Sequence, residues 1–119
     1  MDSTAGRILI VDDDAALLKV MANYLSRLGY RVDACPSAAE ALALVLADSS
    51  LYAAALVDLN MPGMRGEELA RRILDSNASI RLVLMSGYPT GPAGDTLEGN
   101  HVGFLYKPFA PQDLADALE

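Results

Sequence analysis

The chain has 119 residues, of which 52% are hydrophobic and 21% charged, and its net charge is −7. This length is enough for one globular domain with its own core, and the negative charge argues against direct binding to the phosphate backbone of nucleic acids. No apolar run reaches the roughly 18 residues that span a bilayer, and the polar N-terminus does not resemble a signal peptide. Together with a single cysteine, Cys35, these features predict a cytoplasmic domain without membrane contact, in which Cys35 is a buried, inert thiol.

Apolar runs alternate along the chain with segments of helical spacing. The runs predict strands at residues 7–11, 30–35, 53–58, 80–85 and 102–106. Asp14 is expected to cap the first helix, and Ser37 and Glu40 form a capping-box pattern for the second. The hydrophobic residues at helical spacing are Leu17, Met21, Leu25 and Leu28 in the first helix, Leu42, Val45 and Leu46 as the buried stripe of the second, Leu69 and Ile73 in the third (67–74), and Leu114 and Leu118 in a closing helix from Pro111.

This alternation predicts an α/β domain with a five-stranded parallel sheet, right-handed crossovers and helices on both faces. The segment 88–103, where a fourth helix is due, departs from the pattern. It is rich in glycine and proline, which both disfavour the interior of a helix. We therefore expect the fourth helix to be short or irregular.

Polar side chains follow four of the five predicted strands. Asp12 and Asp13 follow the first strand, Asp58 ends the third, and Ser86 and Lys107 follow the fourth and fifth. Open α/β sheets place ligands at the carboxyl ends of their strands, so these residues are expected to converge there. Three carboxylates in one crevice repel each other, and a hard divalent cation such as Mg²⁺ (or Mn²⁺) would compensate their charge.

These side chains suit phosphoryl transfer, which needs an in-line nucleophile, a cation and further donors. Asp58 can be the nucleophile, because a carboxylate forms an aspartyl-phosphate. Asp13 and Asp58 can hold the metal with help from Asp12, while Lys107 and Ser86 can contact phosphoryl oxygens. Taken singly, each residue has a plainer explanation, such as a turn former, a helix cap or a solvated lysine.

Four motifs, at residues 11–14, 57–63, 85–88 and 104–109, resemble those of the response-regulator receiver domain of two-component signalling. The resemblance covers the whole chain, residues 1–119, in the right order and spacing. It implies a flavodoxin-like three-layer sandwich with strand order 2-1-3-4-5. It also implies a phosphorelay in which a histidine kinase or a histidine phosphotransfer protein donates the phosphoryl group to Asp58.

The same resemblance implies individual roles. The metal would be held by Asp13, Asp58 and the backbone carbonyl of Asn60, with Asp12 in support, and the Lys107–Pro108 bond would be cis. Phosphorylation would bias a two-state equilibrium, in which the Ser86 hydroxyl moves toward the phosphoryl group and Phe104 swings inward. Plain core packing is the alternative explanation for Phe104.

Receivers of this kind signal through the face of the fourth helix, fifth strand and fifth helix, and here that face contains the irregular segment 88–103. The usual output interface is therefore in doubt, and a phosphorylation-dependent dimer is one outcome that we expect from the resemblance. The motifs 86–88 and 103–109 look most similar to receivers attached to hybrid sensor kinases. The chain is thus expected to be either a stand-alone protein or a piece of such a kinase.

Two other functions fit part of the pattern. A haloacid-dehalogenase-type phosphatase would use Asp12 as nucleophile and Asp14 as general acid, but it would give Asp58 no role. A pseudo-receiver would keep the fold only as a protein-interaction module, although every acid, serine and lysine that the chemistry needs is present.

Overall fold

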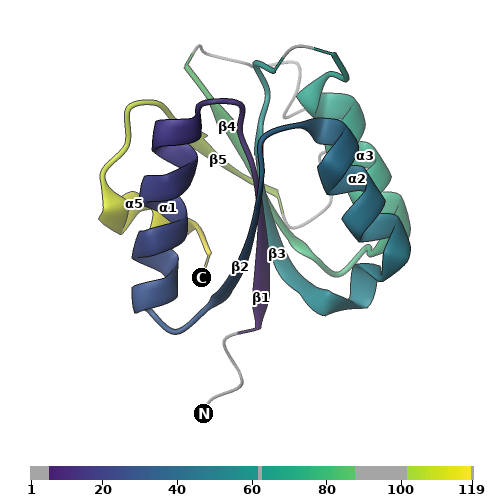
Figure 1. Cartoon of the computed structure of the whole chain (residues 1–119), viewed down its shortest axis with the longest axis horizontal. Helices are drawn as coiled ribbons and strands as arrows, with labels where there is room; N and C mark the ends of the chain where they lie inside the picture. Colours follow the sequence, from purple (N-terminus) through teal and green to yellow (C-terminus); the bar gives the residue numbers. More distant parts are fainter. Residues whose placement is uncertain (1–5, 62, 88–101, 119) are drawn as a thin grey trace.

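A computed structural model of the chain describes residues 6–61, 63–87 and 102–118. The strands β1 (Arg7–Val11), β2 (Arg31–Cys35), β3 (Tyr52–Asp58), β4 (Arg81–Ser86) and β5 (Val102–Tyr106) form one sheet in the order β2-β1-β3-β4-β5, with every pair parallel. Helices α1 (Ala15–Arg27) and α5 (Pro111–Ala117) cover one face, and α2 (Ala38–Ala47) and α3 (Gly66–Ser76) cover the other (Figure 1). The predicted three-layer α/β fold and strand order are confirmed.

The central strand β3 explains why the strand ends meet. Its residues 54–58 are all buried, as expected of a strand covered by helices on both faces. Val57 pairs with Val11 of β1, and Asp58 pairs with Met85 of β4. The carboxyl ends of β1, β3 and β4 therefore lie side by side at one edge of the sheet.

Caps fix the helix starts that follow this edge. The Asp14 carboxylate accepts hydrogen bonds from the backbone N–H groups of Ala16 and Leu17 at 3.1 and 3.2 Å. Ser37 Oγ accepts one from the Glu40 N–H at 3.3 Å. These side chains satisfy backbone donors that a helix start leaves without an intrahelical partner, so both predicted caps are confirmed.

The predicted inward residues of α1 and α2 need correction. In α2 the buried residues are Ala38, Ala41 and Val45, whereas Leu46 is 68% exposed. The prediction overlooked the two alanines, which form the inward stripe together with Val45. Each successive residue lies about 100° further round the helix, so Leu46, which follows Val45, points away from that stripe. In α1 the stripe is Leu18, Met21 and Leu25.

Two of the residues predicted to point inward from α1 do not form part of its buried stripe. Leu17 is only half-buried, and Leu28 at the C-cap is 48% exposed. The third helix matches its prediction, since Leu69 and Ile73 are fully buried. A 3₁₀ turn at Ser49–Leu51 precedes β3 and was not predicted. The predicted short or irregular fourth helix falls mainly on residues 88–101, which lie outside the described part of the chain.

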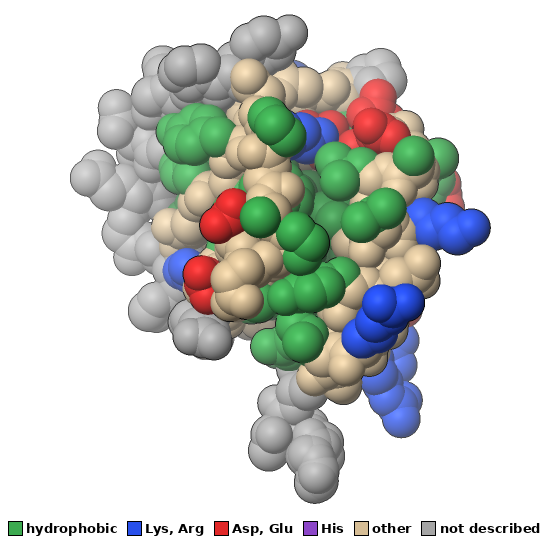
Figure 2. Space-filling model, turned by 90° about the vertical axis from the view of Figure 1, so that its left-hand side faces the viewer, with side chains coloured by type: hydrophobic (Ala, Val, Ile, Leu, Met, Phe, Trp, Pro, Cys, Tyr) green, Lys and Arg blue, Asp and Glu red, His purple; other side chains and the backbone are tan. Residues whose placement is uncertain are grey.

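The layer of α1 and α5 has an apolar outer surface. Figure 2 shows hydrophobic side chains gathered across this side of the molecule, and Val20 on α1 is 58% exposed. A cleft between the two helices is lined by Leu17, Val20, Met21, Tyr24, Phe109, Pro111 and Leu114. Among the residues that the structure describes, no helix is both long and apolar enough to cross a membrane.

Cys35 is the last residue of β2 and is 3% exposed. Burial raises the pKa of its thiol to about 11, and the charges of Glu40 and Asp33 add to the rise. Because the thiolate is the nucleophile, the native protein at pH 8 should react with iodoacetamide about a hundredfold more slowly than the urea-unfolded chain, whose thiol has its ordinary pKa of 9.0. Mass spectrometry of timed samples measures both rates, and equal rates would contradict a buried thiol.

Candidate functional site

Two buried aspartates stand next to each other at the carboxyl edge of the sheet. Asp12 directly follows β1 and is 0% exposed, while Asp58 ends β3 and is 2% exposed. Asp13, in the turn before α1, is exposed. One carboxylate oxygen from each of the three lies within 4.8 Å of the others, so the structure brings together the three acids predicted to converge.

Lys107 reaches this cluster from the end of β5. Its Nζ lies 2.8 Å from Asp12 Oδ2 and 3.5 Å from Asp58 Oδ2. The lysine is placed by its own backbone, because its N–H donates to the carbonyl of Ser86 at 2.8 Å, and the Lys107–Pro108 bond is cis. The cis bond that the resemblance implied is confirmed.

The charges shift each other's protonation. Burial raises the pKa of the Asp58 carboxyl above its usual range, and the Asp12 charge adds to this, against the opposing effects of the Asn60 N–H and Lys107. Burial works against the charge of Lys107, but the hydrogen bond to Asp12 and the charges of Asp12 and Asp58 outweigh it and raise the pKa of the ammonium. Lys107 therefore stays protonated beside carboxylates that repel each other.

The loop after β3 connects Asp58 to Ser86. The Asn60 N–H donates to Asp58 Oδ1 at 3.0 Å, which holds one carboxylate oxygen and leaves Oδ2 toward Lys107. The hydroxyl of Ser86, a fully buried residue, donates to the side-chain oxygen of Asn60 at 3.1 Å. Sequence reasoning missed this side-chain bond, since no pattern fixes the rotamers of two residues that lie on different strand ends.

Phe104 does not join the acidic cluster. It is half-buried on β5 and packs against the core between the sheet and the α2–α3 layer. Its ring stacks on that of Tyr106, with centroids 6.3 Å apart and an angle of 14° between the planes. The described position is compatible with both predicted roles, a switch residue or plain core packing.

The donor set fits a hard divalent cation. Three carboxylates face a single ammonium in the described part of the site, which leaves an excess of negative charge, and carboxylate oxygens are the ligands that Mg²⁺ and Mn²⁺ prefer. Asp12 and Asp58 are buried in a position where water can compensate them only in part. The residues present are therefore suited to hold such an ion.

One residue of the site was not singled out from the sequence. Gly66 opens α3, and a Cβ atom added to it would lie 2.5 Å from the carbonyl oxygen of Asp58 and 2.6 Å from Leu59 Cα. The helix start is thus pressed against the backbone that carries Asp58. The available signal was a glycine at the first position of a helix, where alanine would have the better propensity.

Comparison with known proteins agrees with this geometry. The family profile of the response regulator receiver domain matches residues 8–119. The C4-dicarboxylate transport transcriptional regulatory protein DctD of Rhizobium meliloti (strain 1021) is 34% identical over 117 residues, covering 97% of this chain and 25% of that protein. The chain spans about a quarter to a half of the length of the first curated relatives it matches.

Solved structures give the same picture. A CheY-like receiver domain protein from Methanospirillum hungatei JF-1 has a TM-score of 0.84 at 30% identity, covering 93% of this chain and 88% of that one. A response regulator protein from Burkholderia pseudomallei, solved with a phosphorylated aspartic acid, a calcium ion and citrate, has a TM-score of 0.84 at 25% identity, with 96% and 66% covered.

Proposed function

The chain belongs to the response regulator receiver domain family, and we propose that its Asp58 accepts a phosphoryl group from a histidine kinase or a histidine phosphotransfer protein in a reaction that depends on Mg²⁺. The observation that carries this proposal is the buried Asp58 carboxylate, which lies 3.5 Å from Lys107 and within 4.8 Å of the Asp12 and Asp13 carboxylates. Residues 1–119 act as one phosphoacceptor domain, which modifies itself and does not turn over a separate substrate.

We assign each residue a role in this transfer. Asn60 holds Asp58 Oδ1, so Oδ2 attacks the phosphorus atom while the bond from phosphorus to the donor nitrogen breaks, and the electron pair leaves with the imidazole. Lys107 then pairs with a phosphoryl oxygen in place of Asp12. Asp12, Asp13, Asp58 and the Asn60 carbonyl would hold the metal. When bound, a divalent cation supplies positive charge to the transferring oxygens.

The signal would begin at Ser86. To donate to a phosphoryl oxygen, its hydroxyl must give up the bond to Asn60, and Phe104 on the neighbouring strand can then repack against the sheet. This couples the phosphorylation state to the surface around β5, where a target protein or a second receiver would read it. We also propose that this domain makes no direct contact with nucleic acid and that it serves as a receiver attached to a hybrid kinase or as a stand-alone protein.

The Burkholderia protein supports the choice of chemistry, because it carries a phosphorylated aspartic acid together with a calcium ion. We infer that this chain uses the same class of modification, with Mg²⁺ or Mn²⁺ as its ion.

Incubation with Mg²⁺ and acetyl phosphate should add the mass of one phosphoryl group to the intact chain. We expect no gain in the Asp58→Asn variant, because the nucleophile is lost, and no gain when the metal is removed with EDTA. Intact-mass spectrometry measures all three samples, and an acid-quenched time course follows the decay of the acyl phosphate.

Two outcomes would contradict the proposal. A gain that survives Asp58→Asn but disappears in Asp12→Asn would identify Asp12 as the nucleophile, as in a haloacid-dehalogenase-type phosphatase, which would also hydrolyse many equivalents of a phosphate ester. No gain with acetyl phosphate, and none with a panel of purified histidine kinases, would indicate a pseudo-receiver.

A further inference from the structure

The strand β2 forms one end of the described sheet, opposite β5, and has no strand beyond it. Two hydrogen bonds on its inner side show how its backbone is turned. The Arg31 N–H donates to the carbonyl of Gly6, and the Cys35 carbonyl accepts from the Asp12 N–H, both at 3.2 Å. Because backbone groups of successive strand residues point to opposite sides, Val32 and Ala34 turn their N–H and C=O groups to the outer edge.

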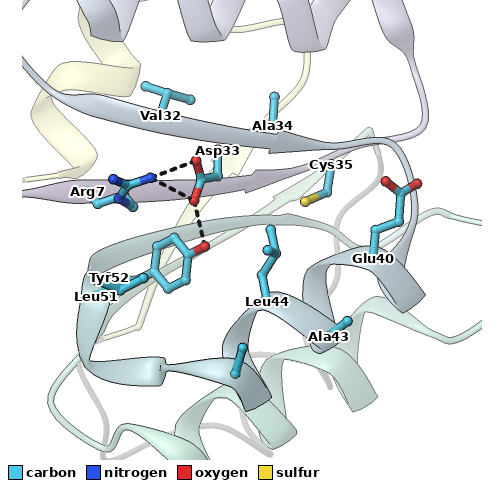
Figure 3. Close-up of a pocket in the computed structure, with 11 residues that line it drawn as sticks. Arg7, Val32, Asp33, Ala34, Cys35, Glu40, Ala43, Leu44, Leu51 and Tyr52 are labelled. Atoms are coloured by element: carbon cyan, nitrogen blue, oxygen red, sulfur yellow. Dashed lines mark hydrogen bonds and ion pairs between the residues drawn. The ribbon is translucent and has the colours of Figure 1, made fainter.

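A groove runs between this edge and α2. It has a volume of about 740 Å³ and is lined by Asp33, Cys35, Glu40, Leu44 and Leu51, among others. Figure 3 shows β2 along one side of the groove and α2 along the other, with the Glu40 carboxylate near Cys35. Two of its apolar side chains are exposed, Leu44 at 39% and Leu51 at 48%.

We propose that two copies of this chain pair through their β2 strands in antiparallel orientation, centred on Asp33, so that Arg31 of each copy enters the groove of the other and meets Glu40. In this register Val32 lies opposite the partner's Ala34. Both residues turn their backbone groups outward, so each such pair exchanges two hydrogen bonds, as antiparallel strands require. The outward backbone groups of one β2 edge are therefore complementary to those of a second copy in this register.

The charges of the edge agree with this register. Arg31 is exposed and shares its side of the strand with Asp33 and Cys35, because side chains alternate along a strand. Side chains directly opposite each other in a pair share a face, so the partner's Arg31 would lie over Cys35. Glu40 is exposed and lies near that thiol, whose pKa its charge helps to raise. Two symmetric Arg31–Glu40 pairs would form.

Asp33 at the centre does not oppose the pairing. Two aspartates would face each other there, but each is neutralised within its own copy. The Arg7 guanidinium lies 3.0 Å from Asp33 Oδ1, and the Tyr52 hydroxyl donates to Asp33 Oδ2 at 2.6 Å. Figure 3 shows the three side chains joined at one end of the groove.

The arrangement also accounts for exposed apolar side chains. A two-fold axis perpendicular to the sheet places the α2 helices of both copies on the same face, on either side of the joined edge. Leu44, which lines the groove, would then approach the partner's α2, and its removal from water would contribute to association. The surface lies at the opposite end of the sheet from β5, so this pairing is independent of phosphorylation at Asp58.

Sedimentation equilibrium should detect a reversible dimer of the full chain, with or without acetyl phosphate. We expect Arg31→Glu and Glu40→Arg each to raise the dissociation constant of the dimer by at least about tenfold. The double variant should recover most of the lost affinity, because the two charges have exchanged places. Arg71→Glu and Asp75→Arg, which change the same charges at exposed positions of α3, serve as controls and should leave it unchanged.

Ala34→Pro tests the backbone pairing. It removes an outward N–H that the monomer does not use, which an edge strand tolerates, and it should abolish the dimer without loss of the folded state. The wild-type chain provides a check that needs no variant: amide exchange at Val32 and Ala34 should slow as the protein concentration rises. A chain that stays monomeric up to about 1 mM, or a dimer in which these two amides exchange quickly, would overturn the proposal.

Discussion

Replacement of Lys107 by methionine should slow the phosphorylation of Asp58 by at least about a hundredfold, because it removes a preorganised donor to the transferring oxygens. It should also lower the free energy of unfolding by about 3 kcal/mol in the absence of metal. Lys107 lies 2.8 Å from Asp12 and 3.5 Å from Asp58, and its loss leaves two buried carboxylates without their cation. Urea unfolding and intact-mass time courses measure the two effects.

Addition of Mg²⁺ distinguishes the contribution of Lys107 to stability from its contribution to the phosphorylation rate. If the acidic cluster holds the ion, Mg²⁺ should restore part of the stability of Lys107→Met, because bound cation replaces the missing charge and binds only the folded state. Mg²⁺ should not restore the phosphorylation rate, since the Lys107 ammonium, which donates to the transferring oxygens, is still absent. Lys19→Met removes a lysine from the exposed side of α1 and should change neither quantity. A Lys107→Met variant that is phosphorylated at the normal rate would remove Lys107 from the proposed mechanism.

The strand-end residues were predictable from the sequence for a physical reason. A continuous apolar run identifies a strand covered on both faces, and alternation with helices makes the sheet parallel. Parallel strands align their carboxyl ends, so Asp12, Asp58 and Lys107 had to converge whatever their distance in sequence. That topology brings Lys107 near Asp12, 95 residues away in the sequence, and the two side chains form an ion pair of 2.8 Å.

Contacts that depend on register and rotamers were not predictable in the same way. The cluster of Arg7, Asp33 and Tyr52 joins three strands, and the sequence does not state how far each strand is shifted along its neighbour. Leu46 was predicted to be buried because it is a hydrophobic residue at helical spacing, although the alanines of α2 define the inward face. Hydrophobicity alone therefore misplaces a leucine when small residues carry the packing.

Gly66 gives the sharpest contrast between local propensity and tertiary packing. By propensity alone, Gly66→Ala should stabilise α3 by up to about 1 kcal/mol. The structure predicts the opposite sign, since the new methyl group would lie 2.5 Å from the Asp58 carbonyl oxygen and 2.6 Å from Leu59 Cα. Both are backbone atoms of β3 and its loop, which cannot turn aside as a side chain can. We expect Gly66→Ala to lower the free energy of unfolding by about 2–3 kcal/mol.

The same steric overlap should also slow the phosphorylation of Asp58. Relief of the overlap requires the start of α3 to move away from the backbone that carries Asp58, and this displaces the carboxylate relative to Lys107. Phosphorylation of Gly66→Ala should therefore slow even under conditions where the variant is fully folded. Gly103→Ala is the matched control, because its methyl group would meet side-chain atoms and no backbone: the end of the Arg81 side chain, with a terminal nitrogen at 2.9 Å, and Val83 Cγ2 at 3.9 Å. The end of an arginine side chain can move. If both variants unfold at the same urea concentration, α3 does not press on the phosphoacceptor strand as the structure indicates.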